Sequence, residues 1–435
     1  MIGPYPVRSA GKNTKTHGKK PWVLLLYGQD CATRPPRARG PQAGVYEGLA
    51  EVGVQPNWIS GVSIGALNTA IIAGNAPENR VQALRDFWNS ICHPLDWVGG
   101  LGAWMPPVFG MHGLARKWAN LWAAGRAVTE GQPGFFSPRV PLPMAGSGKQ
   151  NANVVSYYNT AELKETLLKF ADFARINDGD IRVSVGAVNV RTGNLVYFDN
   201  TKMHLAPEHF MASGALPPGF PAVEIDGEYY WDGGPVSNTP LTEVLSDADH
   251  KDTLVFQVDL WSACGNAPGN FFDVSERAKD IQYSSRTRAI TGMLADRHAR
   301  FIKELLPHVP AELRRTDPLF RLAEEAADGS AINVVHLIYK NRPYEGHYKD
   351  YEFSVDTMQE HWRSGLEDMR DSFARRDWFD VPSREQGFVT HDVHRRPRSV
   401  PESDRDAIAL PTALRARFTM EPRGRHRATL SAASH

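Results

Sequence analysis

Residues 57–68 read Asn57-Trp58-Ile59-Ser60-Gly61-Val62-Ser63-Ile64-Gly65-Ala66-Leu67-Asn68. An apolar, strand-like segment leads into the pattern Gly-x-Ser-x-Gly, and a run of small residues typical of a helix follows. This order of strand, turn and helix is what a nucleophile elbow requires. Gly61 and Gly65 let the chain turn sharply where a Cβ would clash. We therefore predict that Ser63 is a nucleophile and that amides at the start of the helix, around Ile64, face a developing oxyanion.

The segments around this turn predict an α/β sheet. Apolar runs over Trp22–Tyr27 and Thr253–Leu260 are short enough for buried strands of a parallel sheet. Amphipathic helices are predicted over Gln42–Val52 and Asn79–Ile91, and a hairpin begins with the strand Ile181–Val190. Further helices are predicted over Thr160–Phe173, with Thr160 as N-cap, and over Val274–Leu306 and Val355–Phe379. Strands that alternate with helices indicate a sheet covered by helices.

Composition restricts the class of protein. The chain has 435 residues, and its 49 Lys and Arg balance its 49 Asp and Glu, so nucleic acid is not expected as a partner. The three cysteines, Cys31, Cys92 and Cys264, lie far apart, which fits a reducing compartment and argues against a disulfide framework or a zinc site. No apolar run approaches the length of a membrane span. We expect a cytoplasmic protein, with peripheral contact at a membrane surface left open.

A serine nucleophile needs a base, and the first route is a carboxylate. Asp232 follows the strand-like segment Glu228–Trp231 and precedes Gly233 and Gly234. These glycines would let the backbone approach a neighbouring turn, so Asp232 is the candidate base of a Ser-Asp dyad. An ordinary Asp-Gly turn explains the same residues equally well.

The second route is a Ser-His-Asp triad with a late histidine. His391 and His394 lie near the end of the chain, but neither has a distinctive setting. The elbow also follows a single clear strand, and an upstream His-Gly-Gly-Gly segment is missing. A triad esterase therefore stays an alternative.

Several spaced motifs resemble one family. Gln42-Ala-Gly-Val-Tyr-Glu-Gly-Leu49, Gly61-Val-Ser-Ile-Gly-Ala-Leu-Asn68 and Asp232-Gly-Gly234 are similar to motifs of the patatin-like phospholipase family. Asp280-Ile-Gln-Tyr-Ser-Ser-Arg286 and residues 350–365 resemble the C-terminal extension of its bacterial branch. The resemblance covers roughly residues 22 to 394.

The resemblance implies a three-layer α/β/α fold with a mainly parallel central sheet and a helical C-terminal extension. It implies that Ser63 and Asp232 form a Ser-Asp dyad, with Gly233 and Gly234 as motif glycines. The implied activity is hydrolysis of acyl esters in lipids, of the phospholipase A or esterase type, without a metal or another cofactor. The sequence gives no signal for the oligomeric state.

The expected organisation has four parts. They are a disordered leader over residues 1–20, a patatin-like acyl hydrolase domain over 21–262, a mostly helical C-terminal region over 263–395 and a disordered basic tail over 396–435. An irregular stretch over residues 94–153 is interpreted either as a cap over the site or, equally well, as an ordinary surface excursion. Its aromatic and Met side chains line an acyl-chain groove or simply pack, namely Trp104, Met105, Phe109, Phe135 and Phe136.

The chain departs from the family after its first strand, where members carry a glycine run whose amides form the oxyanion hole. Here Gly28 is followed by Gln29-Asp-Cys-Ala-Thr-Arg-Pro-Pro-Arg-Ala-Arg-Gly-Pro41. Proline has no N–H to donate, and losing one oxyanion donor costs on the order of 10²–10³ in rate.

Three interpretations follow from this departure. Gly28 and the start of the Ser63 helix supply enough donors, or an arginine substitutes as a cationic partner (Arg34, Arg37 or Arg39). Alternatively, the chain is a catalytically impaired lipid-binding relative. The third interpretation is a local reading-frame error within residues 29–41.

Overall fold

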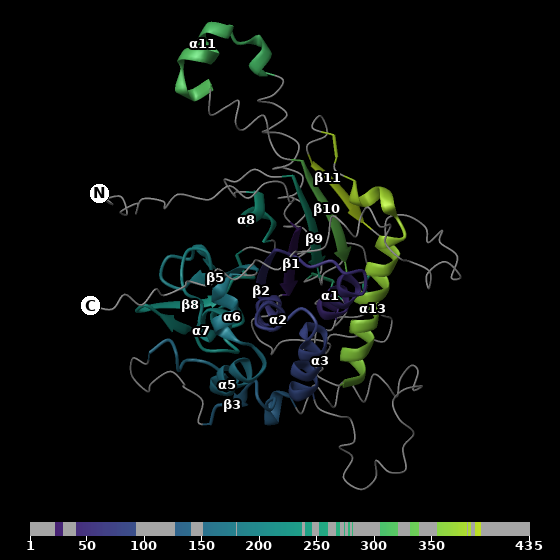
Figure 1. Ribbon diagram of the computed structural model, residues 1–435. Coiled ribbons are helices and arrows are strands. Elements are labelled where there is room, and N and C mark those ends of the chain that lie inside the picture. Colours follow the sequence, from purple (N-terminus) through teal and green to yellow (C-terminus); the bar gives the residue numbers. More distant parts are fainter. Residues whose placement is uncertain are drawn as a thin grey trace, which may run out of the picture.

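We describe the protein from a computed structural model of the chain (Figure 1). The residues described are 22–28, 41–92, 127–140, 151–179, 181–236, 240–245, 252–259, 267–269, 274, 277–278, 281, 305–320, 331–338, 355–380, 382–383 and 388–392. The predicted leader and tail, most of a long helix predicted over 274–306, and residues 29–40 lie outside this set. So do Trp104, Met105, Phe109 and His394.

The central sheet is mainly parallel, as predicted, and its strand order is β11-β10-β9-β1-β2-β5-β8-β7. Its parallel members are β1 (Trp22–Gly28), β2 (Trp58–Ser63), β5 (Arg182–Asn189), β9 (Thr253–Asp259), β10 (Ile332–Ile338) and β11 (Phe388–Asp392). Antiparallel pairing adds β6 (Leu195–Asp199), β7 (Val223–Ile225) and β8 (Glu228–Asp232). A separate pair joins β3 (Ser137–Pro138) to β4 (Tyr158–Asn159).

Strand β1 has β2 on one side and β9 on the other, so the order of the parallel strands reverses at β1. In open α/β sheets, such a switch in strand order opens a crevice at the carboxyl ends of the strands, where ligands bind. Ser63 ends β2 at this edge, beside the end of β1.

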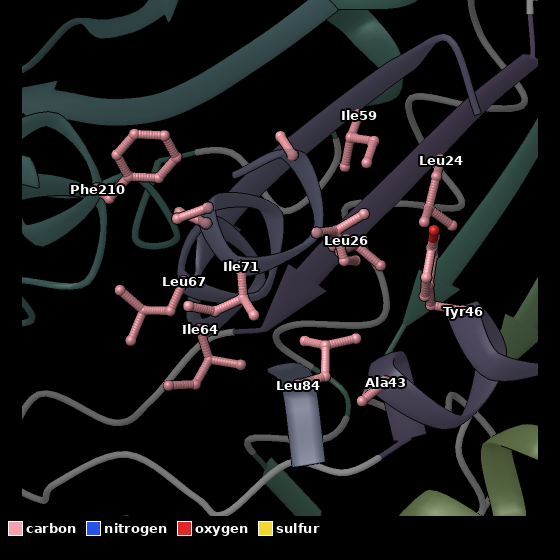
Figure 2. Close-up of a cluster of buried hydrophobic side chains, with 14 of the residues drawn as sticks. Leu24, Leu26, Ala43, Tyr46, Ile59, Ile64, Leu67, Ile71, Leu84 and Phe210 are labelled. Atoms are coloured by element: carbon pink, nitrogen blue, oxygen red, sulfur yellow. The ribbon is translucent and has the colours of Figure 1, made fainter. Parts of the chain in front are cut away.

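Helices cover both faces of the sheet. One face carries α1 (Pro41–Glu51), α2 (Ile64–Ala73), α3 (Arg80–Ile91) and α13 (Val355–Phe373), and the other carries α8 (Leu241–Leu245). Figure 2 shows Leu24 and Leu26 of β1 and Ile64 and Ile71 of α2 as members of one buried cluster. All residues of α2 are buried, so this small, apolar helix forms the centre of the structure. The predicted three layers are therefore present.

Two predicted helices differ in their ends. In place of the single helix predicted over 160–173, the structure has two, α5 (Ala161–Phe170) and α6 (Phe173–Asp178). The second helix begins after Asp172, because the Asp172 carboxylate accepts hydrogen bonds from the amides of Ala174 and Arg175 and so caps it. Thr160, the predicted cap of α5, makes no side-chain cap bond. The helix predicted to reach residue 379 ends at Phe373, and a 3-10 turn (Arg376–Phe379) leads to β11, a strand that was not predicted.

Glycines allow α1 and α13 to approach closely (Figure 1). A Cβ at Gly44 of α1 would lie 1.9 Å from the carbonyl oxygen of Trp362, and one at Gly365 of α13 would lie 2.0 Å from that of Pro41. Gly48 faces the side chain of Met369 in the same way. The two helices therefore meet backbone to backbone, which only glycine permits.

Polar contacts reinforce this contact between α1 and α13, which we call the glycine seam. Arg85 of α3 pairs with Glu47 of α1 at 2.7 Å, and its guanidinium lies 4.5 Å from the ring centre of Trp362. The Trp362 indole N–H also donates to Glu47. Glu47 thus joins three helices, one of which comes from the C-terminal region.

A second polar cluster lies at the amino ends of β2 and β5. The Arg182 guanidinium stacks 3.8 Å from the Trp58 ring centre and pairs with Asp199 at 2.8 Å. The buried Ser184 hydroxyl accepts from the Trp58 indole at 2.9 Å and donates to Asp199 at 3.2 Å. Burial alone would raise the pKa of Asp199, but hydrogen bonds from Thr201 and the charge of Arg182 outweigh burial and lower the pKa.

Among the helices of the described residues, none combines the length and the apolar character needed to cross a membrane.

The glycine seam predicts a large penalty for adding one methyl group. Gly365→Ala should lower the free energy of unfolding by about 3 kcal/mol, because the new Cβ would overlap the backbone of Pro41. Intrinsic helix propensity alone would make the alanine variant more stable, so a loss of stability must come from packing. Chemical denaturation is the measurement, with Gly219→Ala as control, since a Cβ there meets nothing closer than 3.4 Å. Equal stability of the two variants would contradict the seam.

Candidate functional site

Ser63 sits at a strained turn between β2 and α2. Its φ is 58° and its ψ is −130°, a conformation that residues with a Cβ rarely adopt. Such a backbone costs of order 1–3 kcal/mol and persists only where the surroundings impose it. A nucleophile elbow, which the sequence predicts here, would hold its serine in a strained turn of this kind.

The two glycines of the motif impose this turn. A Cβ at Gly65 would lie 2.0 Å from the carbonyl oxygen of Leu26, so α2 starts directly against β1. A Cβ at Gly61 would lie 2.6 Å from both Gly65 O and Thr69 Oγ1. The Thr69 hydroxyl donates to Gly65 O at 2.8 Å. At both positions a Cβ would clash, so the packing requires glycine there.

A residue that sequence reasoning missed supports the same turn. The Ser63 amide donates to the Ser213 hydroxyl at 3.0 Å, and that hydroxyl donates to the carbonyl of Gly186 at 2.6 Å. Ser213 ends α7 (Pro207–Ser213) and is fully buried. The contact spans 150 positions of sequence, so no local pattern could have revealed it.

Asp232 ends β8 and is fully buried. Its backbone amide donates to the carbonyl of Ala215 at 3.0 Å, and its Oδ1 accepts from the amide of Gly234 at 2.8 Å. A Cβ at Gly233 would lie 2.8 Å from the carbonyl oxygen of Gly186. Both motif glycines thus have a structural reason: one holds the carboxylate, and the other allows close approach to β5.

Strand register brings Ser63 and Asp232 to the two sides of β5. Val62 lies opposite Gly186 on one side, and Asp232 lies opposite Ala187 on the other. Two strand spacings put their backbones about 10 Å apart. A serine and an aspartate side chain together cover much of that distance. The structure therefore brings the two predicted residues to one end of the sheet.

Amides at the start of α2 and the end of β1 flank Ser63. Gly28, the last residue of β1, lies in register with Ser63. First-turn amides such as those of Ile64 and Gly65 have no acceptor within their own helix. The first turn of α2 contains no acidic residue, so the positive end of its dipole is not offset there. The departing segment 29–40 lies outside the described residues.

The remaining predicted residues lie elsewhere. Phe135 and Phe136 are buried in an edge-to-face cluster with Tyr158 and Phe220, which favours packing over lining a groove. His391 lies in β11, at the edge of the sheet, where its ring stacks on that of Trp378. In the part of the chain that is described, no group of three His, Cys, Asp or Glu could hold a metal ion.

A further polar cluster, which is largely buried, also escaped sequence reasoning. Asp259 of β9 pairs with the His336 Nε2 of β10, and the Gln257 side-chain amide donates to Asp259 at 3.1 Å. Alternate residues of a strand share a face, so this cluster shares the α8 face with Val255 and Val334. Strand β1 separates it from β2. An aspartate at the end of an apolar run was the available signal.

His209 lies in α7, the helix that ends in Ser213. Its Nδ1 accepts from the Ala206 amide at 2.9 Å, and its ring centre lies 4.7 Å from that of Phe198. Burial lowers the pKa of His209, so the neutral ring is the native form. This makes the anchoring of α7 sensitive to acid.

Two family models match the chain. One, described as patatin-like phospholipase, matches residues 41–245 and includes Ser63 and Asp232. The other, described as patatin phospholipase, matches residues 281–385. The first match begins directly after the segment in which the glycine run is missing. No curated protein matches the sequence.

Two solved structures show a distant likeness. VipD from Legionella pneumophila is 15% identical with a TM-score of 0.28, covering 80% of this chain and 67% of VipD. The type III effector protein ExoU is 14% identical with a TM-score of 0.21, covering 83% of this chain and 82% of ExoU. At TM-scores this low, neither likeness carries weight for fold or function.

The strain at Ser63 predicts an inverted order of stabilities. Ser63→Gly should be more stable than Ser63→Ala, because glycine adopts the φ of 58° freely. The expected difference in free energy of unfolding is about 1 kcal/mol or more. At Ser60, a buried residue of the same strand, the order should be the normal one, with alanine the more stable. Thermal denaturation of the Gly and Ala variants at Ser63 and at Ser60 measures both differences in stability. If alanine is the more stable residue at both positions, the backbone at Ser63 is not strained.

The environment of His209 predicts acid sensitivity. A depressed pKa in the folded state means that the unfolded chain binds the proton more readily. Stability is therefore full above about pH 6.5, the ordinary value for histidine, and falls as the pH drops through the folded pKa. His209→Asn keeps an acceptor for the Ala206 amide but does not titrate. Urea denaturation between pH 7 and 5 should show a smaller loss in the variant, and parallel losses would exclude His209 as the cause.

Proposed function

Since this chain belongs to the patatin-like phospholipase family, we propose that it is a serine lipid acyl hydrolase that uses a Ser63–Asp232 dyad. Ser63 attacks the ester carbonyl while Asp232 accepts the hydroxyl proton. The oxyanion collapses, and the alcohol leaves with that proton. Water then attacks the acyl-enzyme with Asp232 as base, releasing the fatty acid and restoring Ser63.

The strained turn at Ser63 carries this proposal. A buried serine in an ordinary strand would have no reason to hold a φ of 58°, and strain of this kind clusters at active sites. The register that puts Asp232 on the far side of β5 supports the choice of base. Amides in the first turn of α2 support the oxyanion site.

The triad alternative gains no support from the sheet. His391 lies in β11, four strand spacings from β2, which corresponds to about 19 Å. A general base must lie within hydrogen-bond reach of its nucleophile or one water away. His391 is therefore a poor candidate for the base.

A lipid-binding protein without catalysis is the competing function. The missing glycine run favours it, and so does a family match that begins only at residue 41. It predicts a folded protein that binds lipid but neither hydrolyses esters nor reacts at Ser63.

Ester hydrolysis with matched variants tests the proposal. Ser63→Ala should lower kcat for a chromogenic medium-chain ester and for phospholipid vesicles by more than about 10³-fold, and Asp232→Asn by about 10²–10⁴-fold. Ser60→Ala, which removes a buried hydroxyl from the same strand, should keep normal activity. Replacing His391 and His394 together with alanine should also leave kcat nearly unchanged.

A fluorophosphonate probe separates the two functions independently of turnover. Under the proposal it should label Ser63, as located by peptide mass spectrometry, and Ser63→Ala should abolish labelling. Folded protein that shows neither turnover nor labelling would establish the binding function instead. Turnover that survives Ser63→Ala would require another nucleophile.

A further inference from the structure

The segment from Ser213 to Ala215 contacts both halves of the proposed dyad. The side-chain hydroxyl of its first residue, Ser213, accepts a hydrogen bond from the Ser63 amide at 3.0 Å. The backbone carbonyl of its last residue, Ala215, accepts a hydrogen bond from the Asp232 amide at 3.0 Å. Ser63 and Asp232 belong to β2 and β8, which are separated by β5. One short segment at the end of α7 thus touches the backbone of both residues.

The Ser213 hydroxyl extends a hydrogen-bond ladder that the strands themselves do not continue. The pairing of β2 with β5 ends at Val62 and Gly186. The next amide along β2 is that of Ser63, and it turns to the Ser213 oxygen. The same hydroxyl donates its proton to the Gly186 carbonyl at 2.6 Å. Ser213 therefore bridges the two strands at the residue where the backbone departs from strand geometry.

Burial makes this bridge hard to replace. Ser213 is fully buried, as are Ser63 and Gly186 within the same packed end of the sheet. Without the hydroxyl, both the Ser63 amide and the Gly186 carbonyl lose a partner, and buried polar groups left unpaired favour a different local conformation. At Ser63 the available relaxation is a return toward ordinary φ and ψ, which would move the Ser63 hydroxyl.

We propose that Ser213 is a positioning residue of the acyl hydrolase: its hydroxyl holds the Ser63 backbone in the elbow conformation, and Ala215, two residues further along, holds the Asp232 backbone in register. The inference rests on the proposed dyad. It has a further consequence for the oxyanion site. The Ser63 amide is already engaged, so the donors come from residues that follow it, at the first turn of α2, and from the end of β1.

Ser184 provides a matched control for this role. It is the same residue type, it is equally buried, and its hydroxyl also bridges two groups, the Trp58 indole and the Asp199 carboxylate. It lies on β5 as Gly186 does, but two residues nearer the amino end. Removing either hydroxyl costs two buried hydrogen bonds. Only the loss at Ser213 should alter the reaction.

The test compares steady-state kinetics, labelling rate and stability of Ser213→Ala and Ser184→Ala in the full chain. Ser213→Ala should lower kcat for the chromogenic ester about 10- to 100-fold with little change in KM, since small misplacements of a reacting group have effects of this size. The rate of fluorophosphonate labelling at Ser63 should fall by a similar factor. Ser184→Ala should lower Tm comparably and keep both rates.

Two further variants protect the test against misfolding. Ser213→Thr keeps a hydroxyl and should recover most of the lost kcat. Ser213→Cys fills the same space with a much weaker hydrogen-bonding group, and its kcat should lie between those of the Ala variant and the unmodified protein.

The inference would be overturned if Ser213→Ala kept normal kcat and labelling, or if both serine variants lost activity in proportion to Tm. It would also fail if the threonine variant folded but stayed as slow as the alanine variant. A different result would contradict the proposed dyad itself: the Ser63→Ala variant, with no other change, would still hydrolyse the ester or react with the probe.

Discussion

The close approach of α2 to β1 is the constraint on which the rest of the structure depends. Gly65 lies so near β1 that a Cβ would sit 2.0 Å from the Leu26 carbonyl oxygen. Because the helix starts there, the chain has a single residue in which to leave the strand, and Ser63 takes up the turn with a positive φ. Every residue of α2 is buried, so the helix has no room to relieve this turn by moving away. Packing therefore maintains the strain.

The C-terminal region takes part in holding α2 in place. Two of its strands, β10 and β11, extend the central sheet, and α13 lies against α1 through Gly365 and Pro41. The next residue of α1, Gln42, accepts from the Asn68 side chain of α2 at 2.5 Å, and the Asn68 oxygen accepts from Trp88 of α3 at 2.9 Å. A displacement of α13 would reach the first turn of α1 directly and the elbow helix one contact later. The C-terminal region is thus joined to the candidate site through the backbone packing of α13 on α1.

The sequence predicts this structure well where a single segment determines its own conformation. The apolar run of β1 and the amphipathic pattern of α3 each carry their own signal, and both elements are confirmed. The glycines predicted to form the elbow stand where a Cβ would clash. Prediction fails where partners are far apart in the chain. Ser213 resembles any serine at the end of a short helix until the fold brings it to Ser63, and the pair of Asp259 with His336 depends on the register of β9 with β10. The premature end of the helix after α5 was readable in principle, because Asp172 is a good helix cap.

The engaged amide of Ser63 bears on the missing glycine run. A tetrahedral oxyanion needs donors aimed at it, and removing one costs on the order of 10²–10³ in rate. If the glycine run were the sole source of donors, its loss would leave the nucleophile and base with little acceleration. Here the first turn of α2 offers amides that have no acceptor within their helix, at the positive end of its dipole and beside Ser63. A chain that keeps these amides loses part of its oxyanion stabilisation and retains the rest. Under the proposed dyad mechanism, loss of the glycine run alone therefore predicts a slower hydrolase, and complete loss of turnover would require that the α2 amides fail as donors as well.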